Sequence, residues 1–297
     1  MPKPDKFSIM ISRFPGGSIM PIDMPDTTDY FAKLCHDLKM DSRCSEVITA
    51  RVSDTPITMS RNLVVEEAKR DKVTFLLMID NDMSPDVDLG KDPYAEPFMP
   101  TALNFCLDRW DSGPHMVGAP YCGPPPIENV YIFRWATDET DDPSNVSPML
   151  HQYSREEAAT RIGFEAVGAL PTGLILFDMR IFTEILKPPY FYYQWMDKTE
   201  SQKASTEDVT MTRDAGLAGA KVWCFWSAWA GHWKMKLVGR PKIMSTDVIG
   251  DQMKQAVQRD WHLADRVLNM GKPGGNYVPP IMLKPEARDA RQIQVNE

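Results

Sequence analysis

One stretch of the sequence limits the fold more than any other, an uncharged run that ends in two carboxylates. Residues 73–79 are β-branched or bulky, and Asp80-Asn81-Asp82 follows them at once. Seven such residues in a row predict a strand buried on both faces of a mainly parallel sheet. In open α/β sheets the binding crevice lies outside the carboxyl ends of the strands. Asp80 and Asp82 are therefore expected where a ligand and a hard cation could meet them.

The segments before this run predict alternating strands and helices. Strands are expected at 7–11 and 46–50. Helices are expected at 26–40, capped by Asp26 or Thr27, and at 58–70, capped by Thr58 or Ser60. Such a β-α-β-α-β order implies a parallel sheet with right-handed crossovers and a crevice at its carboxyl edge.

The second half of the chain predicts further strands and helices around two irregular segments. Helices are expected at 101–110, 178–186 and 205–217, and strands at 115–119, 165–168, 173–177 and 221–225. The proline-rich segment 120–150 is expected to be a surface excursion, with a mobile lid or an acceptor loop as the alternative. The aromatic segment 190–195 fits an edge strand or a wall on which a sugar ring stacks. Ser205 or Thr206 would cap the helix that carries Glu207 and Asp208 in its first turn.

Composition narrows the class of protein. The chain has 297 residues, 43% of them hydrophobic, which is enough for a sizeable core without disulfides. A net charge of -8 gives no general attraction to nucleic acids, although a local patch could still bind DNA. The five cysteines show no Cys-X-X-Cys spacing and are expected to be reduced thiols. Neither a signal-peptide run nor a membrane-spanning run is present, so we expect a cytoplasmic protein.

Four ordered pieces of the chain together resemble the metal-dependent GT-A glycosyltransferases. They are an Asp-X-Asp motif at 80–82, a glycine-bearing loop at 168–173, an X-Glu-Asp motif at 206–208 and a C-terminal histidine, His232. The pair Arg61-Asn62 also resembles an Arg-Asn found before the central strand in many members. The resemblance covers roughly residues 7–234. It implies an α/β, Rossmann-like GT-A domain whose mainly parallel sheet is flanked by helices.

The resemblance implies a metal and a co-substrate. Asp82 would ligate Mn²⁺ or Mg²⁺, with Asp80 beside it on the metal, on a metal-bound water or on ribose, and with His232 closing the coordination shell. Oxygen ligands with one imidazole suit these cations. The co-substrate would be a nucleotide-diphosphate sugar, most commonly a UDP-sugar. The residues expected to bind it are Asp80, Asn81, Arg61, Asn62 and Gly173.

The resemblance also implies how the sugar would be transferred. Asp208 would take the proton from an acceptor hydroxyl in an inverting displacement, and Glu207 would bind acceptor hydroxyls. The acceptor itself stays open among a glycan, a lipid-linked intermediate, a protein, a small molecule and a hydroxylated base in DNA.

The expected organisation is one catalytic domain with a C-terminal extension. Residues 1–239 would form the domain, with 1–119 as its nucleotide-sugar half and 120–239 as its acceptor half. In the extension, 240–297, a helix at 247–270 carries an apolar stripe that could pack on the domain or on a second subunit. Two other functions remain: a sugar-nucleotide nucleotidyltransferase, from whose glycine-rich motif residues 13–18 depart, and a non-catalytic binding protein with the same fold.

Overall fold

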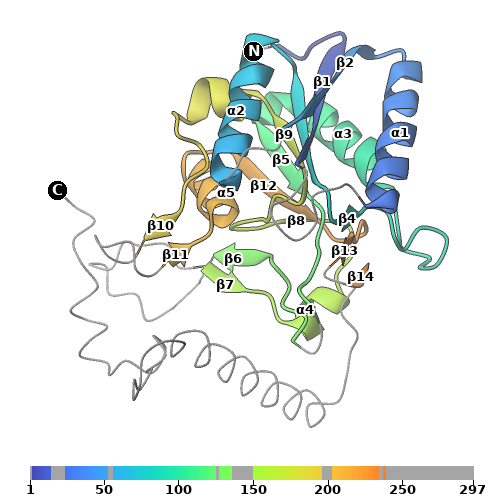
Figure 1. The fold of residues 1–297 in the computed structure, drawn as a ribbon, viewed down its shortest axis with the longest axis vertical. Coiled ribbons are helices and arrows are strands. Elements are labelled where there is room, and N and C mark those ends of the chain that lie inside the picture. Colours follow the sequence, from blue (N-terminus) through green and yellow to red (C-terminus); the bar gives the residue numbers. More distant parts are fainter. Residues whose placement is uncertain are drawn as a thin grey trace, which may run out of the picture.

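A seven-stranded sheet forms the centre of the molecule (Figure 1). The computed structural model of the protein describes residues 2–14, 24–52, 56–124, 127–135, 150–195, 203–233 and 237–238. The strand order is β2-β1-β3-β9-β5-β12-β8. These strands are β1 (Phe7–Phe14), β2 (Cys44–Arg51), β3 (Phe75–Asp80), β5 (His115–Gly118), β8 (Phe164–Ala166), β9 (Leu174–Asp178) and β12 (Lys221–Phe225).

Most strands of the sheet run in one direction. The pairs β1–β2, β1–β3 and β5–β12 are parallel. Strand β9 runs antiparallel to both of its neighbours, β3 and β5, and β8 runs antiparallel to β12. The predicted α/β class with a mainly parallel sheet is therefore confirmed.

Helices cover both faces of this sheet. They are α1 (Pro25–Met40), α2 (Ile57–Arg70), α3 (Phe98–Asp108), α4 (Arg155–Ala159) and α5 (Glu207–Leu217). Helices α2 and α5 contribute to one buried apolar cluster, and α1 and α3 contribute to the other. Within the described residues no helix is long and apolar enough to cross a bilayer.

The central strand β3 connects the two cores, as its sequence predicts. Leu76 and Met78 belong to the cluster under α2 and α5, and Phe75, Leu77 and Ile79 belong to the cluster under α1 and α3. All five side chains are fully buried. The alternation follows from the period of two in a strand, and each such side chain contributes about 1.5–3 kcal/mol by leaving water.

The reversed direction of β9 brings a strand start to the edge where β3 and β5 end. Its first residue follows Gly173, whose carbonyl accepts a hydrogen bond from the backbone N–H of Asp80 at 2.8 Å. On the other side, Ala119 N–H donates to the carbonyl of Leu174 at 3.0 Å. Residues 80, 119 and 173–174 are thereby held together at one rim of the sheet.

Smaller strands complete this rim. Strand β13 (Gly231–Trp233) pairs with β4 (Met83–Ser84) and with β14 (Leu237–Val238). A hairpin, β6 (Phe133–Trp135) and β7 (Leu150–Gln152), lies nearby and is followed by α4 (Figure 1). Strands β10 (Gln194–Trp195) and β11 (Lys203–Ser205) form a separate pair.

The first two helices begin earlier than their predicted caps. Helix α1 begins at Pro25, whose missing N–H suits a first helical position. Thr27 is buried and uses its hydroxyl to bind the carbonyls of Asn81 and Met83 instead of capping the helix. Helix α2 has Pro56 at its N-cap position, so neither Thr58 nor Ser60 caps it.

Other predicted elements differ in length or type. Helix α3 is joined by a 3-10 turn at Trp110–Ser112, and 178–186 contains a π-helix at Ile181–Ile185. The aromatic segment is a strand only at Gln194–Trp195. The irregular segment 120–150 contains the buried Tyr121, Cys122, Val130 and Ile132, so its described part is not a surface excursion. The predicted helix at 247–270 and the rest of 239–297 lie outside the described residues.

Candidate functional site

A cleft of about 630 Å³ opens at the rim where β3 and β5 end. Its volume is in the range typical of small-molecule sites. The titratable side chains that hold this cleft together come from α2, the end of β3, the start of α5 and β13. The residues that line it are Phe14, Ile57, Arg61, Asp80, Asn81, Asp82, Tyr121, Asn129, Tyr131, Phe133, Gln152, Thr206, Glu207, Asp208, Val209 and His232.

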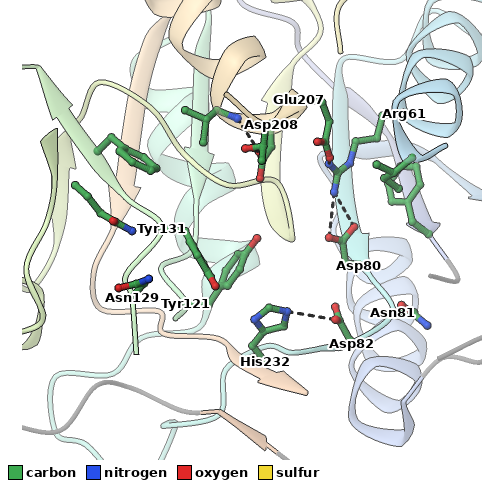
Figure 2. A pocket seen from close by; sticks show the side chains of 16 residues that line it. Arg61, Asp80, Asn81, Asp82, Tyr121, Asn129, Tyr131, Glu207, Asp208 and His232 are labelled. Carbon is green, nitrogen blue, oxygen red and sulfur yellow. Dashed lines mark hydrogen bonds and ion pairs between the residues drawn. The ribbon is translucent and has the colours of Figure 1, made fainter. Parts of the chain in front are cut away.

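Strand pairing brings Asp82 and His232 together although they are far apart in the sequence. Trp233 N–H donates to the carbonyl of Asp82 at 2.8 Å, and His232 lies opposite Met83 in the β13–β4 register. The side chains meet with 3.2 Å between His232 Nε2 and Asp82 Oδ2 (Figure 2). His232 is buried, with 7% of its surface exposed.

The second ring nitrogen of His232 determines what faces Asp82. Nδ1 lies 3.2 Å from the carbonyl oxygen of Cys122. Because a carbonyl only accepts, Nδ1 must carry the hydrogen. In the neutral imidazole Nε2 is then an unprotonated acceptor that faces the acceptor oxygens of Asp82. Two acceptors at this distance need a proton or a cation between them.

A divalent cation fits this pair. Adjacent ligands of an octahedral Mg²⁺ with bonds of about 2.1 Å lie about 3.0 Å apart, close to the observed 3.2 Å. Hydrogen bonding of the remaining ring nitrogen to a backbone carbonyl is also typical of metal-binding histidines. Among the described residues no three His, Cys, Asp or Glu side chains converge on one point. Within the described residues, Asp82 and His232 are thus two side chains that could hold such a cation, and a bound substrate or water would have to supply the other ligands.

Asp80 faces away from this pair, toward Arg61. The Nη2 of Arg61 donates to both carboxylate oxygens of Asp80, at 3.0 and 3.1 Å. Its Nη1 donates to Glu207 Oε1 at 2.5 Å. Arg61 is only 4% exposed and thus forms a buried bridge from β3 to α5 (Figure 2).

Burial and neighbouring charges shift the pKa values of the three bridging side chains in opposite directions. Burial raises the pKa of Asp80, and Arg61 opposes that rise. Burial likewise raises the pKa of Glu207, again opposed by Arg61. Burial disfavours the charge of Arg61, but Asp80 and Glu207 outweigh it, so the pKa of Arg61 is raised. The guanidinium keeps its charge, and it neutralises one of the two carboxylates that it joins.

Asp208 uses one carboxylate oxygen for hydrogen bonds with described residues and directs no such bond through the other. Its Oδ1 accepts from its neighbour Val209 N–H at 2.8 Å and from the hydroxyl of Thr206. Thr206 occupies the predicted N-cap position but does not cap the helix with its side chain. Within the described part of the chain nothing bonds to Oδ2 of Asp208. This oxygen can accept a proton from a ligand in the cleft.

Three other predicted site residues have different positions. Asn81 lines the cleft and is mostly buried. Asn62 lies outside the lining and binds the backbone of Tyr190 and Phe191, fixing that segment to α2. Gly173 is also outside the lining, and its N–H donates to the hydroxyl of Tyr121 at 3.2 Å.

Sequence reasoning did not find the aromatic wall of the cleft. Tyr121 and Tyr131 line it together with Asn129, and their rings meet edge to face with centroids 5.7 Å apart. These residues lie in the segment taken as an irregular excursion. The weak signal for them was position alone, since Tyr121 follows the end of a predicted strand at the same sheet edge as Asp80.

Comparisons with known proteins give fold similarities only. No family model matches the sequence, and no curated protein matches it. Among solved structures, A197 from STIV is 12% identical with a TM-score of 0.44, covering 80% of this chain and 96% of that chain. GalNAc-T7 with UDP, GalNAc and Mn²⁺ is 13% identical with a TM-score of 0.38, covering 77% and 44%. A putative glucose-1-phosphate thymidylyltransferase from Bacillus anthracis, in complex with a sucrose, is 13% identical with a TM-score of 0.39, covering 76% and 89%.

Proposed function

We propose that the protein is a metal-dependent glycosyltransferase that moves a sugar from a nucleotide-diphosphate sugar to an acceptor hydroxyl. The observation that carries the proposal is the contact between His232 Nε2 and Asp82 at the end of the central strand. When Nδ1–H donates to the carbonyl oxygen of Cys122, the neutral form of the imidazole offers the lone pair of Nε2 to a cation that the carboxylate also attracts. A sheet-edge cation next to a cleft of this size is where a diphosphate would bind.

The charge of the cleft supports binding of the anionic donor through a cation. Among the described residues, its lining contains four carboxylates, those of Asp80, Asp82, Glu207 and Asp208, and one guanidinium, that of Arg61. Three negative charges in excess would repel a diphosphate. Mn²⁺ or Mg²⁺, when bound, would neutralise the charge that develops on the departing diphosphate.

The opposite wall supports activation of the acceptor. Asp208 lies at the start of α5, with Oδ1 held by Val209 N–H and Oδ2 open to the cleft. The acceptor hydroxyl would transfer its proton to Oδ2 as its oxygen attacks the sugar opposite the departing diphosphate. This arrangement corresponds to an inverting transfer. UDP is proposed as the nucleotide, and a glycan or a hydroxylated base in DNA as the acceptor.

The test combines ligand titration with turnover. We expect UDP or GDP to bind only with Mn²⁺ or Mg²⁺, and we expect Asp82→Ala to abolish this metal-dependent affinity. Hydrolysis or transfer assays with a panel of nucleotide sugars then measure chemistry. Asp208→Asn keeps the shape of the side chain and loses its basicity, so donor binding should persist while kcat falls about a hundredfold or more.

Asp37→Asn is the matched control, because Asp37 pairs with Lys33 on the exposed face of α1, away from the cleft. Unchanged nucleotide affinity in Asp82→Ala, or after chelation, would remove the metal assignment. Turnover of a nucleoside triphosphate with a sugar 1-phosphate, without sugar transfer, would instead identify a nucleotidyltransferase. Metal-dependent binding with no chemistry toward any donor would indicate a binding protein.

A further inference from the structure

We propose that the hydroxyl of Tyr121 contacts the ligand directly and donates a hydrogen bond to the terminal phosphate of the bound nucleoside diphosphate. This inference rests on the proposed function. It assigns ligand binding to a residue that neither the sequence motifs nor the pair of Asp82 and His232 indicates. It also gives Gly173 a role, which is to set the position of that hydroxyl.

The ring of Tyr121 is fixed beside the pair of side chains formed by Asp82 and His232. Tyr121 comes three residues after β5 ends, at the rim that holds the end of β3. Its ring packs edge to face on His232, with centroids 5.0 Å apart at 70°, and on Tyr131. Only 6% of its surface is exposed, although it lines the cleft (Figure 2). A ring so enclosed directs its hydroxyl to one place.

The hydrogen-bond pattern leaves the proton of this hydroxyl available. Gly173 N–H donates to Tyr121 Oη at 3.2 Å, so the backbone uses the oxygen as an acceptor. A phenol still has one hydrogen to donate. Across the residues that the structure describes, the hydroxyl of Tyr121 has no acceptor. Because a buried donor without an acceptor is costly, a ligand oxygen is the partner that this geometry favours.

A Cβ at position 173 would collide with the outer end of the Tyr121 side chain unless that ring moved. An added Cβ would lie 2.8 Å from the Tyr121 oxygen and 2.9 Å from two ring carbons. The same residue accepts a hydrogen bond from Asp80 N–H at 2.8 Å. Gly173 thus ties the Tyr121 hydroxyl and the Asp80-Asn81-Asp82 run to one point, so their relative position is set by backbone.

The surrounding charges decide which ligand group the hydroxyl would bind. The hydroxyl belongs to a cleft that is also lined by the carboxylates of Asp80, Asp82 and Asp208. A phenol, whose usual pKa is about 10, is protonated at neutral pH and is therefore a neutral donor among these carboxylates. A phosphate held by a cation at Asp82 and His232 would be an anionic acceptor in the same cleft, because Tyr121 lines that cleft and its ring packs on His232.

The experiment measures nucleotide affinity in the presence of Mn²⁺, comparing Tyr121→Phe with the wild type for UDP and UMP, and for GDP and GMP. For the pair that the wild type binds, we expect affinity for the diphosphate to fall about tenfold, the usual effect of losing a hydrogen bond to a charged group. Affinity for the monophosphate, which lacks the terminal phosphate, should change less than about twofold. Tyr190→Phe is the matched control, because that hydroxyl binds Lys69 and Glu66 on the far side of α2.

Each outcome has a distinct meaning. If the wild-type protein binds no nucleoside diphosphate in the presence of the metal, the proposed function is wrong, and this inference is wrong with it. Metal-dependent binding that is equal in the wild type and Tyr121→Phe overturns the inference alone. An equal loss of diphosphate and monophosphate affinity in Tyr121→Phe shows a structural role, and it overturns the inference as well.

Discussion

Arg61 is the residue on which both walls of the cleft depend. It joins Asp80 of β3 to Glu207 of α5 from a position that is almost fully buried. Buried ion pairs often add little net stability, because both groups lose their hydration. Removing one partner is different, because the remaining charge stays buried without compensation. Two carboxylates would remain in this case.

We therefore expect Arg61→Ala to reduce the free energy of unfolding by about 3 kcal/mol or more. Arg70→Ala on the same helix is the control, because Arg70 pairs with Asp71 while 70% of its side chain is exposed. Such a surface pair contributes at most about 1 kcal/mol. Urea unfolding at neutral pH measures both variants. Equal stability of the two would mean that water screens the pair of carboxylates in the open cleft.

At this scale the sequence predicts residue types better than their partners. Asp82 and His232 were expected together, and the structure places them 3.2 Å apart. The partner of Asp80 could not be read from spacing, because Arg61 reaches it only after α2 packs on the sheet. Thr27 was expected as a helix cap. In the structure its hydroxyl donates to the carbonyls of Asn81 and Met83 instead, and sequence spacing does not reveal this contact. Tyr121 had only the weak signal of its position after a predicted strand.

At the scale of elements, the short helix α4 supports the hairpin that forms one wall of the cleft. Ser154 and Glu157 form a capping box, in which each side chain binds the backbone N–H of the other. Arg134 of β6 also donates to Glu157, at 2.6 Å. The same hairpin supplies Phe133 and Gln152 to the lining of the cleft. The cap therefore helps to hold a wall of the site.

The capping box should make stability depend on pH. The hydrogen bond from Ser154 N–H lowers the pKa of Glu157, and Arg134 lowers it further. A carboxylate with a lowered folded pKa stabilises the fold above its unfolded pKa of about 4.3, and this contribution is lost as the pH falls through the folded pKa. Glu157→Ala should thus cost about 0.5–1 kcal/mol at pH 7 and progressively less in acid.

Urea unfolding of the wild type and Glu157→Ala from pH 7 to pH 3 tests this expectation. Glu156→Ala is the control, because Glu156 is the neighbouring exposed carboxylate in the same helical turn. A deficit that stays constant with pH would show that the loss in Glu157→Ala comes from packing of its side-chain methylenes and not from its charge.

The elements themselves were largely predictable, and their directions were not. The uncharged run before Asp80 became β3 because burial on both faces leaves a clear pattern, and the mostly apolar segment at 221–225 became β12. The same pattern identified β9, but a strand's direction depends on which neighbours it joins. Its antiparallel position between β3 and β5 is determined by tertiary packing. The segment at 178–186 showed helical composition, and its π-helical winding at Ile181–Ile185 has no distinct sequence signal.

For the whole molecule, the two expected halves share one sheet. Strand β9 from the second half separates β3 from β5 of the first, and β12 covers the other edge of β5. A fragment of residues 1–124 would leave β5 without either neighbour and would expose the edge of β3 that pairs with β9. We expect this fragment to show no cooperative unfolding transition in urea, whereas the full chain should show one. Circular dichroism measures both, and a cooperative transition in the fragment would establish an independent first half.

The pairing of β13 with β4 has a consequence for how this site tolerates change along the chain. Asp82 and His232 are brought together by a register between two short strands, so the length of chain between them does not set their separation. Insertions in the intervening loops should leave the pair intact, because lengthening a loop adds little to the entropic cost of closing it. A single-residue insertion within 231–233 would turn His232 to the opposite face of its strand. The site should therefore accommodate new segments between its halves far more readily than a one-residue slip inside either of them.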